Sequence, residues 1–307
     1  MARCFVTRKL PGPALERLAQ VHDVDIWPER LPPGYDELRR RTAAAEGLLS
    51  MLTDRVDAGL INGSPQLRAI ANYAVGYDNV DVEAATGRSI AVGNTPDVLT
   101  DATADLAFAL LLGAARRIPQ ASAAIPAGEW VTWEPATYLG YDVHGATLGI
   151  VGGGRIGEAV ARRTAGFAME VLVHSRSSGI SLPELLQRSD FVSLHCPLTP
   201  QTRHMIDAAA LAQMRPTAIL SNTARGPIVD QTALLTALRD GTIAGAALDV
   251  TDPEPLPADD PLLSAPNLIV VPHIGSATHT TREQMAMLSV ENLLAALDGE
   301  PMPHAVS

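Results

Sequence analysis

Short apolar runs rich in β-branched residues alternate with amphipathic stretches along nearly the whole chain. In the first third of the sequence these runs predict five strands, at residues 3–7, 24–27, 48–52, 67–73 and 90–92. Stretches such as PALERLAQV and YDELRRRTAAAE lie between them and have the apolar spacing of helices. Such alternation with short connections is typical of a parallel sheet that carries helices on both faces.

The alternation is interrupted once and then starts again. An alanine-rich helix is predicted over Asp101–Arg117, and the segment IPAGEWVTWEPATYLGYD after it has no clear period and is expected to be irregular. The helix is apolar on more than one face, which favours burial between domains or subunits. Six further strands are then predicted, at residues 147–151, 171–174, 191–196, 218–222, 246–250 and 268–272.

These patterns predict an α/β protein with two doubly wound parallel-sheet domains. We expect a first domain over residues 1–98 and a dinucleotide-binding domain over residues 99–278. The last amphipathic helix has no sheet of its own, so the segment 279–307 is expected to complete the first domain.

Composition and charge narrow the class of protein. With 47% hydrophobic residues among 307, the chain can bury two cores, and 23 basic against 34 acidic residues argue against a nucleic-acid partner. Only Cys4 and Cys196 are present, which fits a reducing compartment. No apolar run spans a membrane and the N-terminus lacks a signal-peptide pattern, so we expect a cytoplasmic protein without a membrane partner, and we assign no metal site.

A glycine-rich turn follows the first strand of the second domain. Gly152-Gly153-Gly154-Arg155-Ile156-Gly157 fits G-x-G-x-x-G between the strand TLGIV and the helix RIGEAVARRTAGF. Gly152 allows the tight turn, Gly154 the approach of a pyrophosphate, and Gly157 close packing of helix on strand. A glycine turn without a ligand is the alternative, but the strand–turn–helix context favours a dinucleotide site.

The end of the next strand bears on the choice of dinucleotide. An NAD-specific domain places an acidic residue there, whereas this chain has His174-Ser175-Arg176. Ser175 can donate a hydrogen bond and Arg176 can pair with a 2′-phosphate. The sequence therefore favours NADPH, with NADH as the second choice; a merely solvated Arg176 is the alternative.

Three polar residues follow predicted strands of the second sheet. Arg225 lies in NTARGPIVD, Glu254 in TDPEPLP and His273 in PHIGSAT. Singly they could be an exposed arginine, a turn glutamate and a capping histidine. Together they suit ketone reduction: histidine donates a proton, a carboxylate orients it, and a guanidinium grips a substrate carboxylate and can polarise the ketone.

The chain resembles the D-isomer-specific 2-hydroxyacid dehydrogenases, and within them the glyoxylate/hydroxypyruvate reductases. The resemblance covers the chain from about Met51 onward. It is carried by NYAVGYDNVDV, GNTPDVLTDATADLAFALLLGAARR, TLGIVGGGRIG, SDFVSLHCPLTPQT, NTARGPIVDQTAL, ALDVTDPEPLP and PHIGSATHTTREQM. It implies reduction of a small 2-oxo acid to the D-2-hydroxy acid with NAD(P)H, in a homodimer whose active-site cleft lies between two Rossmann-like domains.

The resemblance also implies roles for individual residues. Arg225 would bind substrate, Glu254 would be the partner of the histidine, and His273 would be the acid/base. Residues implied at the cofactor are Gly152, Gly154, Arg155, Ile156, Gly157, Ser175, Arg176, Cys196, Pro197, Thr202, Thr223, Ala224, Asp249, His273 and Gly275. Residues implied at the substrate are Val75, Gly76, Arg225, His273, Ser276 and Trp133, the last reaching a neighbouring subunit's site.

Two rival functions and two departures from the family pattern stay open. A corepressor-like NAD(H)-sensing binding protein shares the fold and the three polar residues, and a phosphoglycerate or phosphite dehydrogenase shares the family. The segment SRSSGISLPELLQRSD is short for the group, and a loop of different shape around Arg176 would alter its contact with a 2′-phosphate. Gly153 stands where a larger apolar residue is common, at a position that the glycine pattern leaves free.

Overall fold

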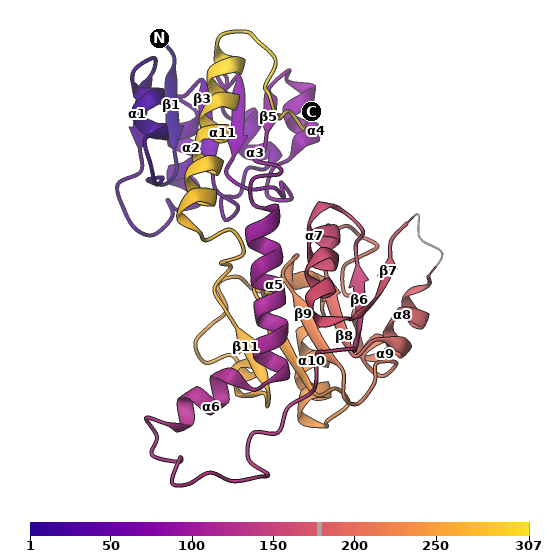
Figure 1. Ribbon diagram of the computed structural model, residues 1–307. Helices are drawn as coiled ribbons and strands as arrows, with labels where there is room; N and C mark the ends of the chain where they lie inside the picture. The colour runs from indigo at the N-terminus through magenta and orange to yellow at the C-terminus, as the bar shows by residue number, and fades with distance from the viewer. Residues whose placement is uncertain (177–179, 307) are drawn as a thin grey trace. The chain divides into compact units, whose positions relative to one another are not determined.

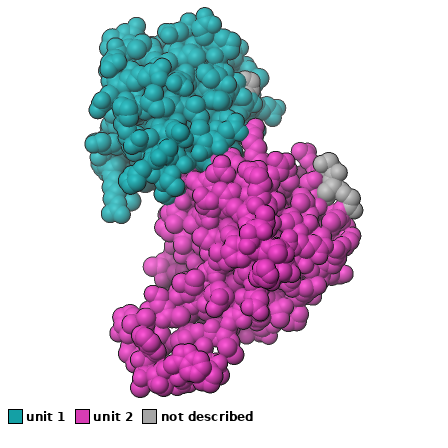
Figure 2. All heavy atoms as spheres, viewed as in Figure 1, with its two compact units in different colours: residues 1–99, 277–307 teal, residues 100–276 magenta. Residues whose placement is uncertain are grey.

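The structure is a computed structural model that describes residues 1–176 and 180–306 (Figure 1). The chain divides into two compact units, Met1–Leu99 with Ala277–Ser307 and Thr100–Ser276 (Figure 2). Each unit is built around its own parallel sheet with helices on both faces. The predicted fold class, two doubly wound parallel sheets, is confirmed.

Unit 1 contains a five-stranded parallel sheet in the order β2-β1-β3-β4-β5. Its strands are β1 (Arg3–Val6), β2 (Asp23–Ile26), β3 (Gly47–Ser50), β4 (Ala69–Asn72) and β5 (Ala91–Gly93). Its helices are α1 (Ala14–Ala19), α2 (Tyr35–Thr42), α3 (Ala58–Asn62), α4 (Val82–Gly87) and α11 (His279–Leu297). Both β3 and β4 are fully buried, as apolar central strands of a parallel sheet should be.

The C-terminal helix α11 is part of unit 1 and packs on β3, β4 and α1 (Figure 1). A side chain in place of Gly47 would meet Leu293 and Leu297, so this glycine lets the helix approach the sheet closely. The chain after α11 then returns to the edge strand, where Ala305 forms an antiparallel bridge with Gly93. The C-terminal segment therefore covers the edge that β5 would otherwise expose.

Unit 2 contains a six-stranded parallel sheet in the order β11-β10-β9-β8-β6-β7. Its strands are β6 (Thr147–Val151), β7 (Glu170–His174), β8 (Phe191–Leu194), β9 (Ile219–Asn222), β10 (Gly245–Leu248) and β11 (Leu268–Val270). The first strand, β6, lies between the second and third, so the winding reverses between β6 and β8. Ligands of open α/β sheets bind at the carboxyl ends of the strands at such a switch point.

Two apolar cores cover the faces of this sheet because its strands alternate their side chains. On one face Leu148, Ile150 and Phe191 pack with α5 (Thr100–Ala115) and α7 (Arg155–Arg163). On the other, Val192 and Leu220 pack with α8 (Leu182–Arg188), α9 (Ala208–Leu211) and α10 (Gln231–Arg239). Single-turn 3₁₀ helices lie at Thr164–Phe167, Gly226–Ile228 and Pro261–Ser264.

The strand predictions hold to within two residues at each end, but the long helix differs. It ends at Ala115, and Arg117 adopts a left-handed backbone with φ 51°. A further helix that the sequence analysis missed, α6 (Ile118–Ala124), begins there with Pro119 in its first turn. Proline fixes φ near the helical value and suits a helix start, which was the available signal. Among the described residues, no helix is long and apolar enough to cross a membrane.

Candidate active site

The glycine turn lies at the carboxyl end of β6, at the switch point of unit 2. Gly152 has φ 109°, and a Cβ there would come within 2.6 Å of the Cys196 nitrogen, in the loop after β8. A Cβ on Gly157 would lie 2.1 Å from the Gly152 carbonyl oxygen. Gly154, the N-cap of α7, has open space where its side chain would be. The turn therefore presents free backbone and a helix N-terminus, and these residues fit a dinucleotide pyrophosphate.

The neighbouring strand β7 ends at His174 and is followed by Ser175 and Arg176, so no acidic residue stands at this position. Ser175 is half-buried and Arg176 is exposed. The His174 ring nitrogen Nδ1 lies 2.9 Å from the Ile180 carbonyl oxygen, so the ring links the end of β7 to Ile180. Gly179, in the shortened segment, lies outside the described residues.

The loop after β8 is held together by its own side chains. Thr202 Oγ1 donates to the Pro197 carbonyl oxygen at 2.7 Å and accepts from the Thr199 N–H at 2.8 Å. Burial raises the pKa of the Cys196 thiol to about 11, so it stays protonated and is no nucleophile.

His195, in the same loop, was not singled out from the sequence. Its Nε2 lies 2.8 Å from the Ser193 hydroxyl and its Nδ1 3.4 Å from that of Thr223, so the ring links the ends of β8 and β9. Burial lowers its pKa to about 4, which keeps the ring neutral. A lone histidine after an apolar strand was the only signal.

The loop after β9 carries Thr223, Ala224 and Arg225. The buried Asn222 carboxamide accepts from the Ala224 N–H at 3.0 Å and donates to the Arg225 carbonyl oxygen at 2.8 Å. The oxygen and the nitrogen of the Asn222 side chain therefore both hold the turn that carries the Arg225 guanidinium. A Cβ on Gly226 would overlap the Thr251 carbonyl at 1.9 Å, so this turn packs tightly against the chain after β10.

His273 and Glu254 meet at the same edge of the sheet. They follow β11 and β10, and His273 Nδ1 lies 2.5 Å from Glu254 Oε1. His273 has a left-handed backbone with φ 52°, and its N–H donates to the Asp249 carbonyl oxygen at 2.9 Å. With Nδ1 engaged by the carboxylate, Nε2 is the nitrogen left to exchange a proton with a ligand.

Asp249, at the end of β10, organises the turn that begins at His273. Its carboxylate accepts from the N–H groups of Ile274 at 2.6 Å and Gly275 at 2.8 Å. Burial raises its pKa, and these two hydrogen bonds oppose that rise. Ser276 follows directly and is half-buried.

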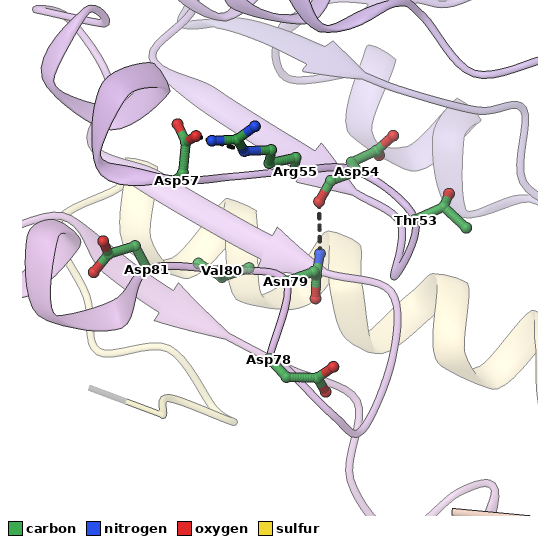
Figure 3. Close-up of a pocket in the computed structure, with 8 residues that line it drawn as sticks. All are labelled: Thr53, Asp54, Arg55, Asp57, Asp78, Asn79, Val80 and Asp81. Carbon is green, nitrogen blue, oxygen red and sulfur yellow. Dashed lines mark hydrogen bonds and ion pairs between the residues drawn. The ribbon is translucent and has the colours of Figure 1, made fainter. Parts of the chain in front are cut away.

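Unit 1 holds its own polar pocket beside the loop that contains Val75 and Gly76. It is lined by Thr53, Asp54, Arg55, Asp57, Asp78, Asn79, Val80 and Asp81 (Figure 3). Two of its acids have structural roles: Asp57 and Asp81 cap α3 and α4 through the N–H groups of Leu60 and Ala84. Among the described residues, no group of acidic, histidine and cysteine side chains is placed to hold a metal.

A doubly wound sheet with a glycine turn at its switch point and a histidine–glutamate pair at the same edge defines a dinucleotide-dependent oxidoreductase. The family model for the D-isomer specific 2-hydroxyacid dehydrogenase NAD binding domain matches residues 108–275. The chain belongs to the D-isomer specific 2-hydroxyacid dehydrogenase family. The resemblance read from the sequence is therefore confirmed.

Relatives of similar length extend the match over both units. A glyoxylate reductase of Korarchaeum cryptofilum is 49% identical over 317 residues, covering 99% of this chain and 96% of the relative. The TT0316 protein of Thermus thermophilus superposes with a TM-score of 0.95 at 49% identity, and the match covers 99% of this chain and 100% of that protein. An NADPH-dependent glyoxylate/hydroxypyruvate reductase of Sinorhizobium meliloti, solved with NADP and malonate, superposes with a TM-score of 0.88 at 35% identity. This match covers 99% of this chain and 96% of the reductase.

Proposed function

We propose that the protein reduces glyoxylate, and small 2-oxo acids like it, to the D-2-hydroxy acid with a reduced nicotinamide dinucleotide. The observation that carries the proposal is the His273–Glu254 pair, 2.5 Å apart at the carboxyl edge of a sheet whose glycine turn fits a dinucleotide. The names of the relatives support glyoxylate as substrate. When bound, the dinucleotide supplies the hydride.

His273 is the proposed proton donor to the ketone oxygen. Glu254 holds Nδ1, so Nε2 is directed away from the carboxylate. Proton transfer from Nε2 neutralises the alkoxide that forms as the carbonyl carbon accepts hydride. In the reverse reaction the neutral ring accepts the hydroxyl proton.

Arg225 is the proposed anchor of the substrate carboxylate in unit 2. Its guanidinium offers a planar fork that matches a carboxylate, and the Asn222 clamp limits the movement of its backbone. From unit 1, the backbone N–H groups at Val75 and Gly76 are proposed to bind the same carboxylate. Ser276 is proposed to line the substrate site.

The cofactor is proposed to lie along the glycine turn and the loops after β8, β9 and β10. Arg155 and Ile156 open α7 beside the pyrophosphate, and Cys196, Pro197, Thr202, Thr223, Ala224, Asp249 and Gly275 belong to the loops that flank the dinucleotide. Ser175 and the exposed Arg176 favour NADPH over NADH because a guanidinium can pair with a 2′-phosphate.

A homodimer is proposed from the apolar surface on α6 and the segment after it. Trp130, Val131 and Trp133 are 69%, 88% and 79% exposed. Figure 1 shows that α6 and this segment extend away from the six-stranded sheet. Apolar side chains exposed together mark an interaction surface, and Trp133 is proposed to reach the partner's substrate site.

The proposed function is tested by steady-state kinetics with glyoxylate, hydroxypyruvate, pyruvate and phenylpyruvate, each with NADPH and NADH. We expect the highest kcat/KM for glyoxylate or hydroxypyruvate. Cofactor binding without turnover of any 2-oxo acid would instead favour the corepressor-like alternative. Phosphoglycerate and phosphite are assayed beside them with NADP and NAD, and turnover confined to these two would favour the other dehydrogenases of the family.

A further inference from the structure

Two buried asparagines at the carboxyl edge of unit 1 bind the loop that contains Val75 and Gly76. Asn72 ends β4 and Asn94 directly follows β5. The register pairs Ala71 with Gly93, so the next residues along the two strands, Asn72 and Asn94, are neighbours. Both side chains are almost fully buried.

Each asparagine donates a hydrogen bond to one carbonyl group of the loop. Asn72 Nδ2 lies 2.9 Å from the Gly76 carbonyl oxygen, and Asn94 Nδ2 lies 2.8 Å from that of Val75. In a trans peptide the carbonyl and the following N–H point in opposite directions. Holding these two carbonyls against the asparagines therefore turns the N–H groups of Gly76 and Tyr77 away from them.

Those N–H groups are free to receive a ligand. Within the part of the chain that the structure describes, the backbone N–H groups of Val75, Gly76 and Tyr77 donate to no protein acceptor. Successive unpaired N–H groups on one stretch of backbone are suited to bind an anion such as a carboxylate.

The asparagines are themselves held in place. Asn72 Oδ1 accepts from the Ser50 hydroxyl at 3.0 Å and from Asn79 Nδ2 at 3.2 Å, which leaves Nδ2 as the end that faces Gly76. Asn79 also donates to the carbonyl oxygens of Met51 and Asp54, each at 3.0 Å; Figure 3 draws the bond to Asp54.

The backbone of Asn94 is anchored from the C-terminal segment. Its N–H donates to the His304 carbonyl oxygen at 3.1 Å, and its carbonyl oxygen accepts from Asn292 Nδ2 of α11 at 2.9 Å. Asn292 Oδ1 accepts in turn from the His304 N–H at 3.0 Å. The end of the chain thus helps to fix the residue that orients the loop.

We propose that Asn72 and Asn94 are positioning residues for the substrate: their amides orient the Val75–Gly76 peptide groups so that the loop's N–H groups bind the carboxylate of a 2-oxo acid. This inference rests on the proposed function, in which that loop contacts the substrate. Serine or aspartate could not replace them, because a serine hydroxyl is too short and an ionised carboxylate has no hydrogen to donate.

The test compares Asn72→Ala and Asn94→Ala with the unaltered protein. Each variant leaves a loop carbonyl without its donor, so kcat/KM for glyoxylate should fall about 10- to 100-fold, mainly through KM. The inhibition constant of oxalate, a non-reacting dicarboxylate, should rise in parallel. The NADPH dissociation constant, measured by fluorescence, should change less than about twofold because the cofactor site lies in unit 2.

Ser64→Ala is the matched control in the same unit. Ser64 is fully buried, and its hydroxyl donates to the Leu60 carbonyl oxygen of α3 at 2.8 Å rather than to a carbonyl of the loop. It should lower Tm and leave KM unchanged. Equal KM changes in the control and the asparagine variants would overturn the inference.

The two proposals fail in different ways. Absence of glyoxylate turnover by the unaltered protein would overturn the proposed function and this inference with it. Normal turnover with an unchanged KM in both asparagine variants would overturn the inference alone. If Asn72→Ala does not fold, Asn94→Ala decides the matter, since Asn94 lies at the end of the edge strand and keeps its backbone anchors.

Discussion

A single residue, His273, combines the proposed chemistry with an unusual backbone. Its left-handed φ of 52° brings the ring to Glu254, and non-glycine residues in this region cost about 1 kcal/mol or more. The hydrogen bonds from Ile274 and Gly275 to Asp249 hold the following turn and offset that cost. The geometry is thus maintained by neighbours rather than by the preference of the residue itself.

Replacing the members of this pair should separate chemistry from cofactor binding. His273→Ala should abolish glyoxylate reduction while NADPH still binds, because the proton donor is lost and the glycine turn is intact. Glu254→Gln should lower kcat less than His273→Ala, because the ring that donates the proton is retained and only the carboxylate that holds Nδ1 is changed. Unaltered turnover by His273→Ala would contradict the assignment of His273 as the proton donor.

Arg176 should distinguish the two cofactors. Losing one charge-assisted contact of roughly 1.5–3 kcal/mol with a 2′-phosphate should reduce NADPH affinity about 10- to 150-fold in Arg176→Ala. NADH has no such phosphate and should bind almost as before. The measurement is kcat/KM for both cofactors, and equal losses would show that Arg176 does not contact the phosphate.

His195 should make folding stability depend on pH. Its pKa is about 4 in the folded protein against an ordinary value of 6.5, so the unfolded chain binds the extra proton between these values. The contribution of His195 to the free energy of unfolding is therefore fully present above pH 6.5 and is lost as the pH falls toward 4. Urea unfolding of wild type and His195→Gln at pH 7 and pH 5 should show a smaller loss in the variant; parallel losses would contradict this origin.

At the scale of elements, the contact between β6 and α7 determines whether the dinucleotide site can form. The first turn of α7 approaches the strand closely only because Gly157 lacks a side chain, and alanine there would collide with the Gly152 carbonyl. Helix propensity alone would favour alanine by about 1 kcal/mol. Tertiary packing therefore overrides the local preference.

Gly157→Ala should accordingly lower both Tm and NADPH affinity, the latter about tenfold or more, because the strand and helix must separate. Gly166→Ala is a suitable control, since its Cβ would meet open space. Differential scanning fluorimetry with and without NADPH measures both effects. A Gly157→Ala protein as stable as the control would refute the packing argument.

The whole molecule is expected to function as a dimer through the surface on α6 and the segment after it. Light scattering at micromolar concentration should report twice the chain mass for the wild type. Val131→Glu should shift the protein toward monomer because it places a charge at an 88% exposed apolar position. Leu31→Glu, at a 73% exposed position in unit 1, should leave the mass unchanged. A fully active wild-type monomer would contradict the dimer.

Local patterns in the sequence were sufficient for the architecture. Parallel strands buried on both faces are continuous apolar runs, and amphipathic helices carry their own period, so eleven strands could be located to within two residues. Arg225, Glu254 and His273 could be singled out because each lies in the loop after such a strand. The end of α5 was missed because the left-handed turn at Arg117 has no strong sequence signal, and Pro119 was the one local signal for the start of α6.

Only the tertiary structure could reveal the groups that position these side chains. Asn72, Asn94 and Asn222 stand in the sequence as ordinary polar residues at strand ends, and what they bind depends on how strands and turns meet in space. The same holds for the C-terminal segment, which reaches β5 through about 200 residues of intervening chain. Hydrogen bonds between residues distant in sequence have no local period, so the sequence by itself determined the two sheets and the tertiary structure decided which buried amides orient their loops.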